Sequence, residues 1–208
     1  MRFQADMQRL HTIKSIKAKI EAKRKLLPDY AAFCDGMMEA AAPGDRVADD
    51  ILATVMVWRI DTADYTGALT IAEYMLAHSL AMPARYQRDA ATTVTEEIAD
   101  AALRDLAEKK PFDLDILLMT EDMTAKADMP DEVRAKLHKA IGLELHRQAN
   151  VETANAKDAT DPTDLLTQAA EALRRAQGFD GRCGVKKVIE QIERALKQLN
   201  AAKAPTAD

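Results

Sequence analysis

Four aspartates near the centre of the chain come closest, in type and spacing, to a catalytic pattern. Asp49 and Asp50 precede a helical pattern, and Asp61 and Asp64 follow it. Carboxylates that converge across a helical hairpin could hold one or two Mg²⁺ ions and so cleave a phosphodiester bond. The same positions equally suit helix starts and solvated helix ends, which is the interpretation we favour. The sequence therefore predicts no catalytic residue and no metal ligand.

Other catalytic patterns are absent or misplaced. A Pro-Asp and Glu-x-Lys nuclease pattern fits only out of order, on Pro28-Asp29 or Pro130-Asp131 with Glu21-Ala22-Lys23 or Glu108-Lys109-Lys110. The four histidines include no pair four residues apart, no cysteine lies near any of them, and there is no Walker loop. We therefore expect no cofactor.

Basic side chains at the start of the chain point instead to nucleic-acid binding. Residues 1–28 hold eight Lys or Arg against two acids, a net charge of +6, so the other 180 residues carry −11 of the total of −5. A basic arm on an acidic body is typical of a polyanion-binding element. The predicted phosphate contacts of this arm are Lys14, Lys17, Lys19, Lys23, Arg24 and Lys25. The same cations could instead only solubilise the outside of a coiled coil.

A loop after Pro83 holds a second, smaller group of candidates. Arg85 and Arg88 flank Tyr86, so the loop could hold phosphate by charge and stack a base or a sugar. Such a stretch is more often an exposed loop without a ligand. We find no recognition helix of the helix-turn-helix type, so direct reading of bases is not expected.

The elements that must position these residues are predicted to be helices throughout. Ala, Leu, Met, Lys and Glu are abundant, aromatic residues make up 4%, and Gly and Pro number seven each, which indicates an all-α protein. A long basic N-terminal helix is expected from about Gln4 to Leu27, ended by Pro28. Its narrow seam of Phe3, Met7, Leu10, Ile13, Ile16, Ile20 and Leu27 suits a coiled-coil contact with another helix.

Antiparallel helical hairpins, loosely similar to tetratricopeptide hairpins, are expected after this helix. Turn signals lie around Asp61–Asp64 and around Gly178–Gly181, and the Thr95 hydroxyl is expected to cap a helix that ends near Glu108. We therefore predict a basic oligomerisation and DNA-contact helix at 1–28, a helical core at 29–149, a linker at 150–164, a C-terminal helical hairpin at 165–200 and a flexible tail at 201–208.

The cysteines and the hydropathy of the chain favour a reducing compartment. Cys34 and Cys183 are far apart and lack the density of a secreted disulfide scaffold. No apolar run approaches the roughly 20 residues that span a bilayer. We expect no membrane association.

Several strings resemble a known family. They are DDIL, VMVWRIDTADYTGAL and LAMP within Asp49–Pro83, with further similarity at Ala127–Leu143 and at GVKKVIEQIERALK of Gly184–Lys197. Together they resemble the small terminase subunit of temperate tailed phages, also known as the terminase endonuclease subunit. The resemblance implies a packaging protein that binds double-stranded phage DNA at its packaging site as a homo-oligomeric ring. It also implies delivery of that DNA to an ATP-hydrolysing large terminase subunit, in the cytoplasm of the bacterial host.

Two other functions stay open at this point. One is a helical adaptor that binds only protein, with the basic arm as a coiled-coil element. The other is a metal-dependent endonuclease subunit that cuts phage DNA, with Asp61 and Asp64 in its site. If the chain takes part in cleavage, we expect it to present DNA to a catalytic large subunit.

Overall fold

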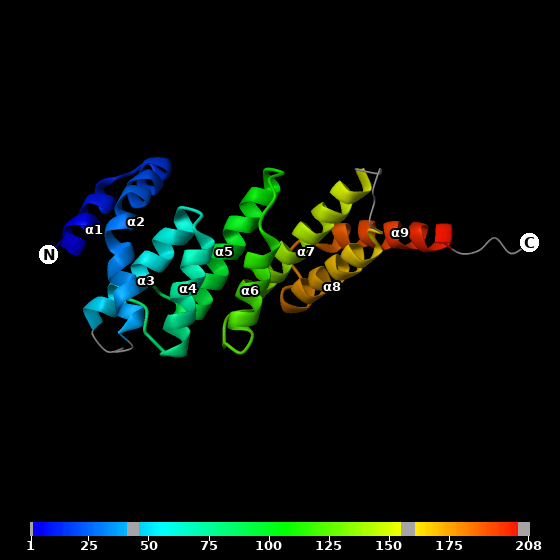
Figure 1. Cartoon of the computed structure of the whole chain (residues 1–208). Helices are drawn as coiled ribbons and strands as arrows, with labels where there is room; N and C mark the ends of the chain where they lie inside the picture. Colours follow the sequence, from blue (N-terminus) through cyan, green and yellow to red (C-terminus); the bar gives the residue numbers. More distant parts are fainter. Residues whose placement is uncertain (1, 41–45, 155–160, 204–208) are drawn as a thin grey trace, which may run out of the picture. The chain divides into compact units, whose positions relative to one another are not determined.

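The computed structural model describes residues 2–40, 46–154 and 161–203, and within these ranges it contains nine helices and no strand (Figure 1). The all-α prediction is confirmed. The helices are α1 (Arg2–Thr12), α2 (Ile16–Glu39), α3 (Arg46–Asp61), α4 (Tyr65–Ala77), α5 (Ala90–Ala107), α6 (Leu114–Thr124), α7 (Asp131–Ala154), α8 (Thr163–Phe179) and α9 (Lys186–Lys203). In the part of the chain that is described, no helix is long and apolar enough to cross a membrane.

The chain forms two compact units, Met1–Glu97 and Ile98–Asp208. Their boundary falls within the segment 29–149 that was expected to be one helical core. The predicted linker at 150–164 is shorter in the structure, since α7 continues to Ala154 and α8 begins at Thr163. Residues 155–160 and most of the predicted tail lie outside the described residues, so the functional segmentation stays a prediction.

The prediction of a single N-terminal helix over Gln4–Leu27 is wrong. α1 ends at Thr12, and the hydroxyl of Ser15 accepts a hydrogen bond from the Ala18 N–H, 3.3 Å away, at the start of α2. The apolar seam is therefore divided between two helices that contact each other within one chain. The sequence reasoning missed the break because the apolar period runs through the capping serine.

Pro28 does not end the helix, contrary to the expectation from sequence. It lies inside α2, where it removes one backbone hydrogen bond, and the helix continues to Glu39. Tyr30 and Cys34 lie in the part of α2 after Pro28, and both are buried. Burial of these side chains offsets the lost hydrogen bond, so tertiary packing overrides the local preference.

An aromatic cluster joins the first three helices. The ring centroid of Tyr30 lies 5.8 Å from that of Phe3 and 5.7 Å from that of Trp58, in edge-to-face geometry, and Trp58 is only 2% exposed. The Tyr30 hydroxyl donates a hydrogen bond of 2.6 Å to Asp6. Burial, aided by this carboxylate, raises the pKa of Tyr30, so the phenol stays a donor.

The turn between α3 and α4 is closed by what we call the Arg59–Asp64 clasp. Asp64 accepts a hydrogen bond from the Gly67 N–H with one carboxylate oxygen, at 3.2 Å, and forms an ion pair with Arg59 through the other. Ala63 holds the left-handed conformation, with φ of 65°, that closes the end of α3. A Cβ on Gly67 would lie 2.1 Å from the Arg59 guanidinium, so only glycine leaves room for the clasp.

α5 begins earlier than expected. Asp89 accepts hydrogen bonds from the Thr92 N–H at 2.8 Å and from the Thr92 hydroxyl at 3.0 Å, which caps a helix that starts at Ala90. The prediction that Thr95 is the cap is wrong. Thr95 is buried inside the helix, and its hydroxyl donates to the carbonyl of Ala91.

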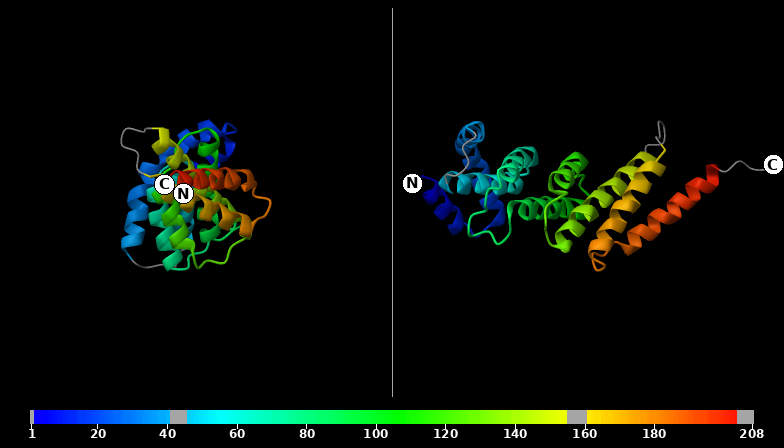
Figure 2. Two further views of the ribbon diagram at one scale, coloured as in Figure 1. Left: turned by 90° about the vertical axis from the view of Figure 1, so that its right-hand side faces the viewer. Right: turned by 90° about the horizontal axis from the view of Figure 1, so that it is seen from below.

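α7, α8 and α9 lie side by side in the second unit (Figure 2). α7 and α8 approach closely at Gly142, where an added Cβ would lie 2.6 Å from Leu173 and 3.0 Å from the carbonyl oxygen of Ala169. α8 and α9 form the C-terminal hairpin that the sequence predicted. Gly142 thus sets the distance between the two helices of this unit that contact each other most extensively.

A buried glutamate ties the segment after α5 to α7. Glu144 is 1% exposed and accepts hydrogen bonds from the Phe112 N–H (3.3 Å), from Gln148 (3.0 Å) and from two nitrogens of Arg147 (2.8 and 2.6 Å). Burial alone would raise the pKa of Glu144. The hydrogen bonds from Arg147, Gln148 and Phe112 outweigh burial and hold that pKa below its usual value, so the carboxylate is charged.

We expect Gly142→Ala to lower the free energy of unfolding by about 1–3 kcal/mol, because the new methyl group must displace Leu173 or the α8 backbone. Gly178→Ala is the matched control within α8, since nothing lies within 4 Å of its added Cβ. That variant should leave stability unchanged or raise it by about 0.5 kcal/mol. Urea denaturation of both variants measures the difference, and equal stability would contradict the close approach.

Glu144→Gln should lower the free energy of unfolding at neutral pH by about 2 kcal/mol, because Arg147 and the Phe112 amide lose a charged acceptor. A lowered pKa in the folded state means that the stabilisation is complete above the usual glutamate value of about 4.3 and is lost as the pH falls below it. The difference in free energy of unfolding between the variant and the parent should therefore become smaller in acid. Denaturation curves across the pH range test this, with exposed Glu190→Gln as a control that should show no gap at any pH.

Candidate nucleic-acid interface

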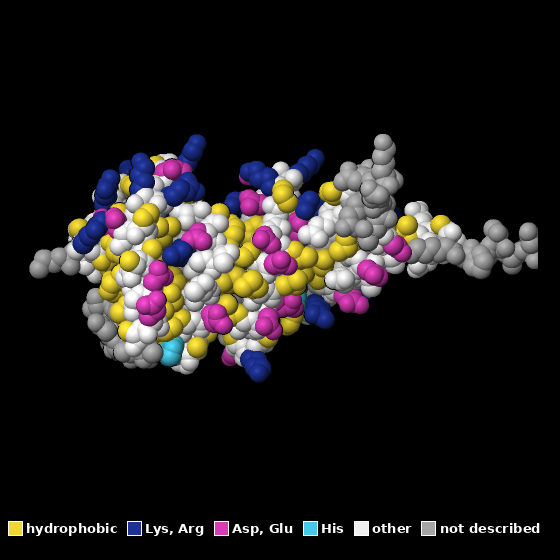
Figure 3. Space-filling model, viewed as in Figure 1, with side chains coloured by type: hydrophobic (Ala, Val, Ile, Leu, Met, Phe, Trp, Pro, Cys, Tyr) yellow, Lys and Arg dark blue, Asp and Glu magenta, His cyan; other side chains and the backbone are white. Residues whose placement is uncertain are grey.

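Four of the predicted lysines are free on the α1–α2 turn and the helix that follows it. Lys14 lies in the connection between α1 and α2, and Lys17, Lys19 and Lys25 lie on α2. Lys19 is half-buried and the other three are exposed. Among the described residues none of the four forms an ion pair. Figure 3 shows Lys and Arg side chains gathered over this end of α1 and α2.

Arg9 is a cation that the sequence reasoning did not select. It lies in the last turn of α1 and is exposed, close in the chain to Lys14. Within the described part of the chain it has no carboxylate partner. The signal was hidden because a single straight helix was expected, whereas the break at 13–15 makes the end of α1 part of the turn.

The groove between α1 and α2 has mixed charge. Its volume is about 620 Å³, and it is lined by charges of both signs. Arg2 pairs there with Asp29 and lies 3.8 Å from Asp6. Arg2 is thus neutralised, whereas Arg9 and Lys25, which also line the groove, have no ion pair among the described residues and belong to the free positive charge of α1 and α2.

Two predicted contacts, Lys23 and Arg24, have structural partners instead. Lys23 forms an ion pair with Asp61, and its side chain is only 14% exposed. Arg24 pairs with Glu21, and its second terminal nitrogen donates to the carbonyl of Thr62 at 3.4 Å. Both side chains fasten α2 to the α3–α4 turn and so hold the basic turn in place.

The aspartates with catalytic spacing are also engaged. Asp61 pairs with Lys23, and Asp64 forms the clasp with Arg59. Asp50 is half-buried, and the side chain of Asp49 lies outside the described residues. Within the described ranges, no group of three or more His, Cys, Asp or Glu residues is placed to hold a metal ion.

The arginines of the loop after Pro83 contact other helices. Arg85 donates a hydrogen bond to the hydroxyl of Thr54 on α3 and lies 5.1 Å from the centroid of the Tyr86 ring. Burial raises the pKa of Tyr86, against the nearby Arg85. Arg88 pairs with Glu96 of α5 at 3.1 Å. The loop residues therefore have protein partners, unlike the lysines of the turn.

The chain is similar to known proteins over most of its length. The sequence model of one family, described as the phage small terminase subunit, matches residues 1–132. A protein of Escherichia phage P2, the "Terminase, endonuclease subunit", is 43% identical over 193 residues, which are 93% of this chain and 71% of that protein. No solved structure gives a significant match.

We expect two single substitutions that remove the same charge to act differently. Lys23→Ala should lower the free energy of unfolding by about 1 kcal/mol, because it leaves the half-buried Asp61 without its partner. Lys14→Ala should leave stability unchanged, since no partner is lost. Thermal denaturation of the two variants measures this, and equal losses would contradict the division into structural and free lysines.

Proposed function

Because this chain belongs to the phage small terminase subunit family, whose members act in phage DNA packaging, we propose that its α1–α2 turn binds the backbone of double-stranded phage DNA. Several copies form a homo-oligomer, in the form of a ring. This assembly delivers the DNA to the large terminase subunit, which hydrolyses ATP.

One observation carries the DNA contact: Lys14, Lys17 and Lys19 lie at or near the α1–α2 turn and Lys25 lies further along α2, all four without a carboxylate partner among the described residues. Each such lysine can replace a counterion on a phosphate, which supplies affinity that depends strongly on salt. Phosphate contacts carry no sequence information by themselves. The turn therefore gives affinity, and the choice of the packaging site requires something more than these lysines.

Oligomerisation raises the overall affinity for DNA when each single contact is weak. A single arm with a net charge of +6 binds DNA modestly at physiological salt, and the body of the chain carries −11. When several arms are held in one closed assembly, the second and later contacts form at high effective concentration. A closed ring of identical subunits is a common way to obtain such repetition.

A test of the DNA contact compares two double variants with the same change of charge. Lys14→Glu/Lys17→Glu alters the turn, and Lys186→Glu/Lys187→Glu alters exposed positions at the start of α9. Fluorescence anisotropy with packaging-site DNA over a salt series gives the affinity and its salt slope. We expect the turn variant to lose affinity at least about tenfold and to lower the slope by about 2, whereas the α9 variant stays near the parent.

The remaining functions are outcomes of the same experiment. Equal losses in the two double variants would mean that only overall charge matters and would remove the turn from the proposal. No salt-sensitive binding in the parent would leave the helical protein adaptor. Mg²⁺-dependent cutting of DNA by this chain alone, lost in Asp61→Ala or Asp64→Ala, would favour the endonuclease that the name of the phage P2 protein suggests.

A further inference from the structure

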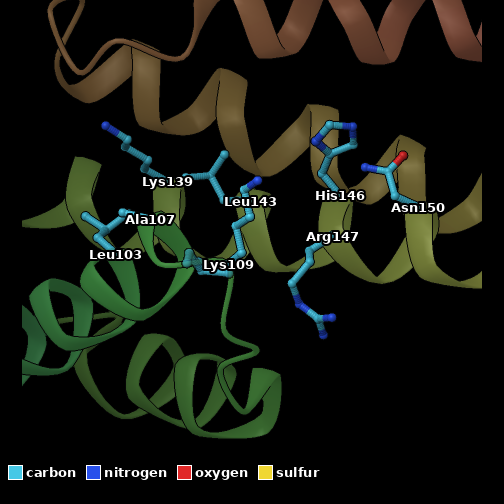
Figure 4. A pocket seen from close by; sticks show the side chains of 9 residues that line it. Leu103, Ala107, Lys109, Lys139, Leu143, His146, Arg147 and Asn150 are labelled. Carbon is cyan, nitrogen blue, oxygen red and sulfur yellow. The ribbon is translucent and has the colours of Figure 1, made fainter.

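The second unit contains a basic pocket with an apolar floor, between the end of α5 and α7. Its volume is about 420 Å³. Leu103 and Leu106 of α5 and Leu143 of α7 line it, and the Lys109 side chain extends beside Leu143 (Figure 4). Lys139 and Arg147 also line the pocket, and none of the lining residues is acidic. Such a pocket is unusual on a body whose net charge is strongly negative.

Lys109 is held at this pocket by the backbone. Its φ of 60° is left-handed, and its N–H donates to the carbonyl of Leu106 at 3.0 Å while the Lys110 N–H donates to that of Asp105 at 2.9 Å. This pattern closes α5 in the way that a glycine usually does. A lysine in that backbone conformation is strained, and such strain is frequent at functional sites.

The positive charge of the pocket comes from two lysines. Arg147 is bound by Glu144 through two hydrogen bonds, so its charge is cancelled locally. Lys139 donates to the carbonyl of Cys183 at 2.7 Å, which is an uncharged acceptor, and Lys109 has no ion-pair partner in the described part of the chain. Burial lowers the pKa of His146, which is therefore neutral at pH 7.

The charged residues just outside the pocket change its net positive charge little. Glu108 pairs with Lys110 at 2.6 Å, Arg104 is exposed and Asp105 is half-buried. The charges of these four residues sum to zero, which leaves Lys109 and Lys139 as the excess. The pocket therefore suits an apolar side chain that has a carboxylate beside it.

α6 of the same unit presents a surface of that chemistry. Asp115, Leu118, Met119 and Asp122 are all exposed and follow one another at intervals of three, one and three residues, so they share one face of the helix. We call this face the α6 stripe. Leu118 is 42% and Met119 49% exposed, and the two aspartates have no ion pair among the described residues. Figure 3 shows acidic side chains beside apolar ones over α6.

We propose that the α6 stripe of one copy docks into the α5–α7 pocket of a second copy. Leu118 and Met119 then cover the leucine floor, and the aspartates face Lys109 and Lys139. The two surfaces differ and every copy carries both, so the contact is head-to-tail and generates a ring if it closes. The proposal rests on the homo-oligomer of the proposed function and names the contact that builds it.

The second copy is the occupant that the chemistry of this chain supports. The pocket needs apolar side chains between carboxylates, and the α6 stripe supplies them in that order, with its apolar pair left in water in a single chain. A stripe of about two helical turns buries less than the roughly 800 Å² per partner of a stable interface. A pair of copies therefore associates weakly, and closure of a ring strengthens each contact.

Cysteine cross-linking between two differently marked chains tests the contact. One chain carries Ala107→Cys at the pocket and the other carries Leu118→Cys on the stripe, both with Cys183→Ser. Cys34 stays, because it is fully buried and burial raises its pKa to about 11. We expect the mixture to form a disulfide-linked heterodimer, whereas a mixture of Leu118→Cys with exposed Gln168→Cys of α8 does not.

Charge exchange adds a test that damage to the fold cannot imitate. Lys109→Glu on the pocket chain should lower cross-linking at least about tenfold, because the stripe then meets a like charge. Asp122→Lys or Asp115→Lys on the stripe chain should have a similar effect. Combining Lys109→Glu on one chain with at least one of these reversals on the other should restore cross-linking.

Several results would overturn this interface. They are cross-linking of Leu118→Cys chains with themselves, which indicates a symmetric contact, equal cross-linking of the Gln168→Cys control, and failure of every charge exchange. Lys14→Glu/Lys17→Glu should cross-link like the parent when no DNA is present. Absence of DNA binding by the parent chain with cross-linking intact would therefore end the DNA proposal alone, and DNA binding by the parent chain without cross-linking would end the interface alone.

Discussion

The first unit depends on the ion pair between Arg59 and Asp64. The Asp64 carboxylate caps α4 and also binds the guanidinium of Arg59 in the last turn of α3. The two helices are therefore fixed around a three-residue turn. The residues on either side of the clasp then face the N-terminal helices. Trp58 packs against the rings of Phe3 and Tyr30, and Asp61 binds Lys23. α1 and α2 therefore pack against the helical hairpin that the clasp holds together.

This arrangement decides which positive charges are available to DNA. Lys23 faces the α3–α4 turn that the clasp closes, and Asp61 at the end of α3 neutralises it. Basic residues on the turn beyond it, such as Lys14 and Lys17, face solvent. The string VMVWRIDTADYTGAL, which carries part of the family resemblance, thus has a structural task in this chain, and the lysines proposed for DNA binding lie outside it.

Glu144 has a comparable task in the second unit. A buried carboxylate is tolerable only when it is fully hydrogen-bonded, and here it fixes the segment after α5 to α7. The same contact cancels the charge of Arg147. What remains at the pocket is an apolar floor with Lys109 and Lys139, so an internal ion pair shapes the chemistry of an external surface.

The sequence by itself determined the helical class, the turn at Asp61–Asp64 and the C-terminal hairpin, because these depend on local periodicity, caps and turn residues. Only the tertiary structure decided that α2 continues through Pro28, since the gain comes from burying Tyr30 against distant rings. It also separated Lys23 from Lys14, which look alike in the sequence. Their difference lies in whether a carboxylate 38 residues away reaches the ammonium group, and such a contact has no local signal.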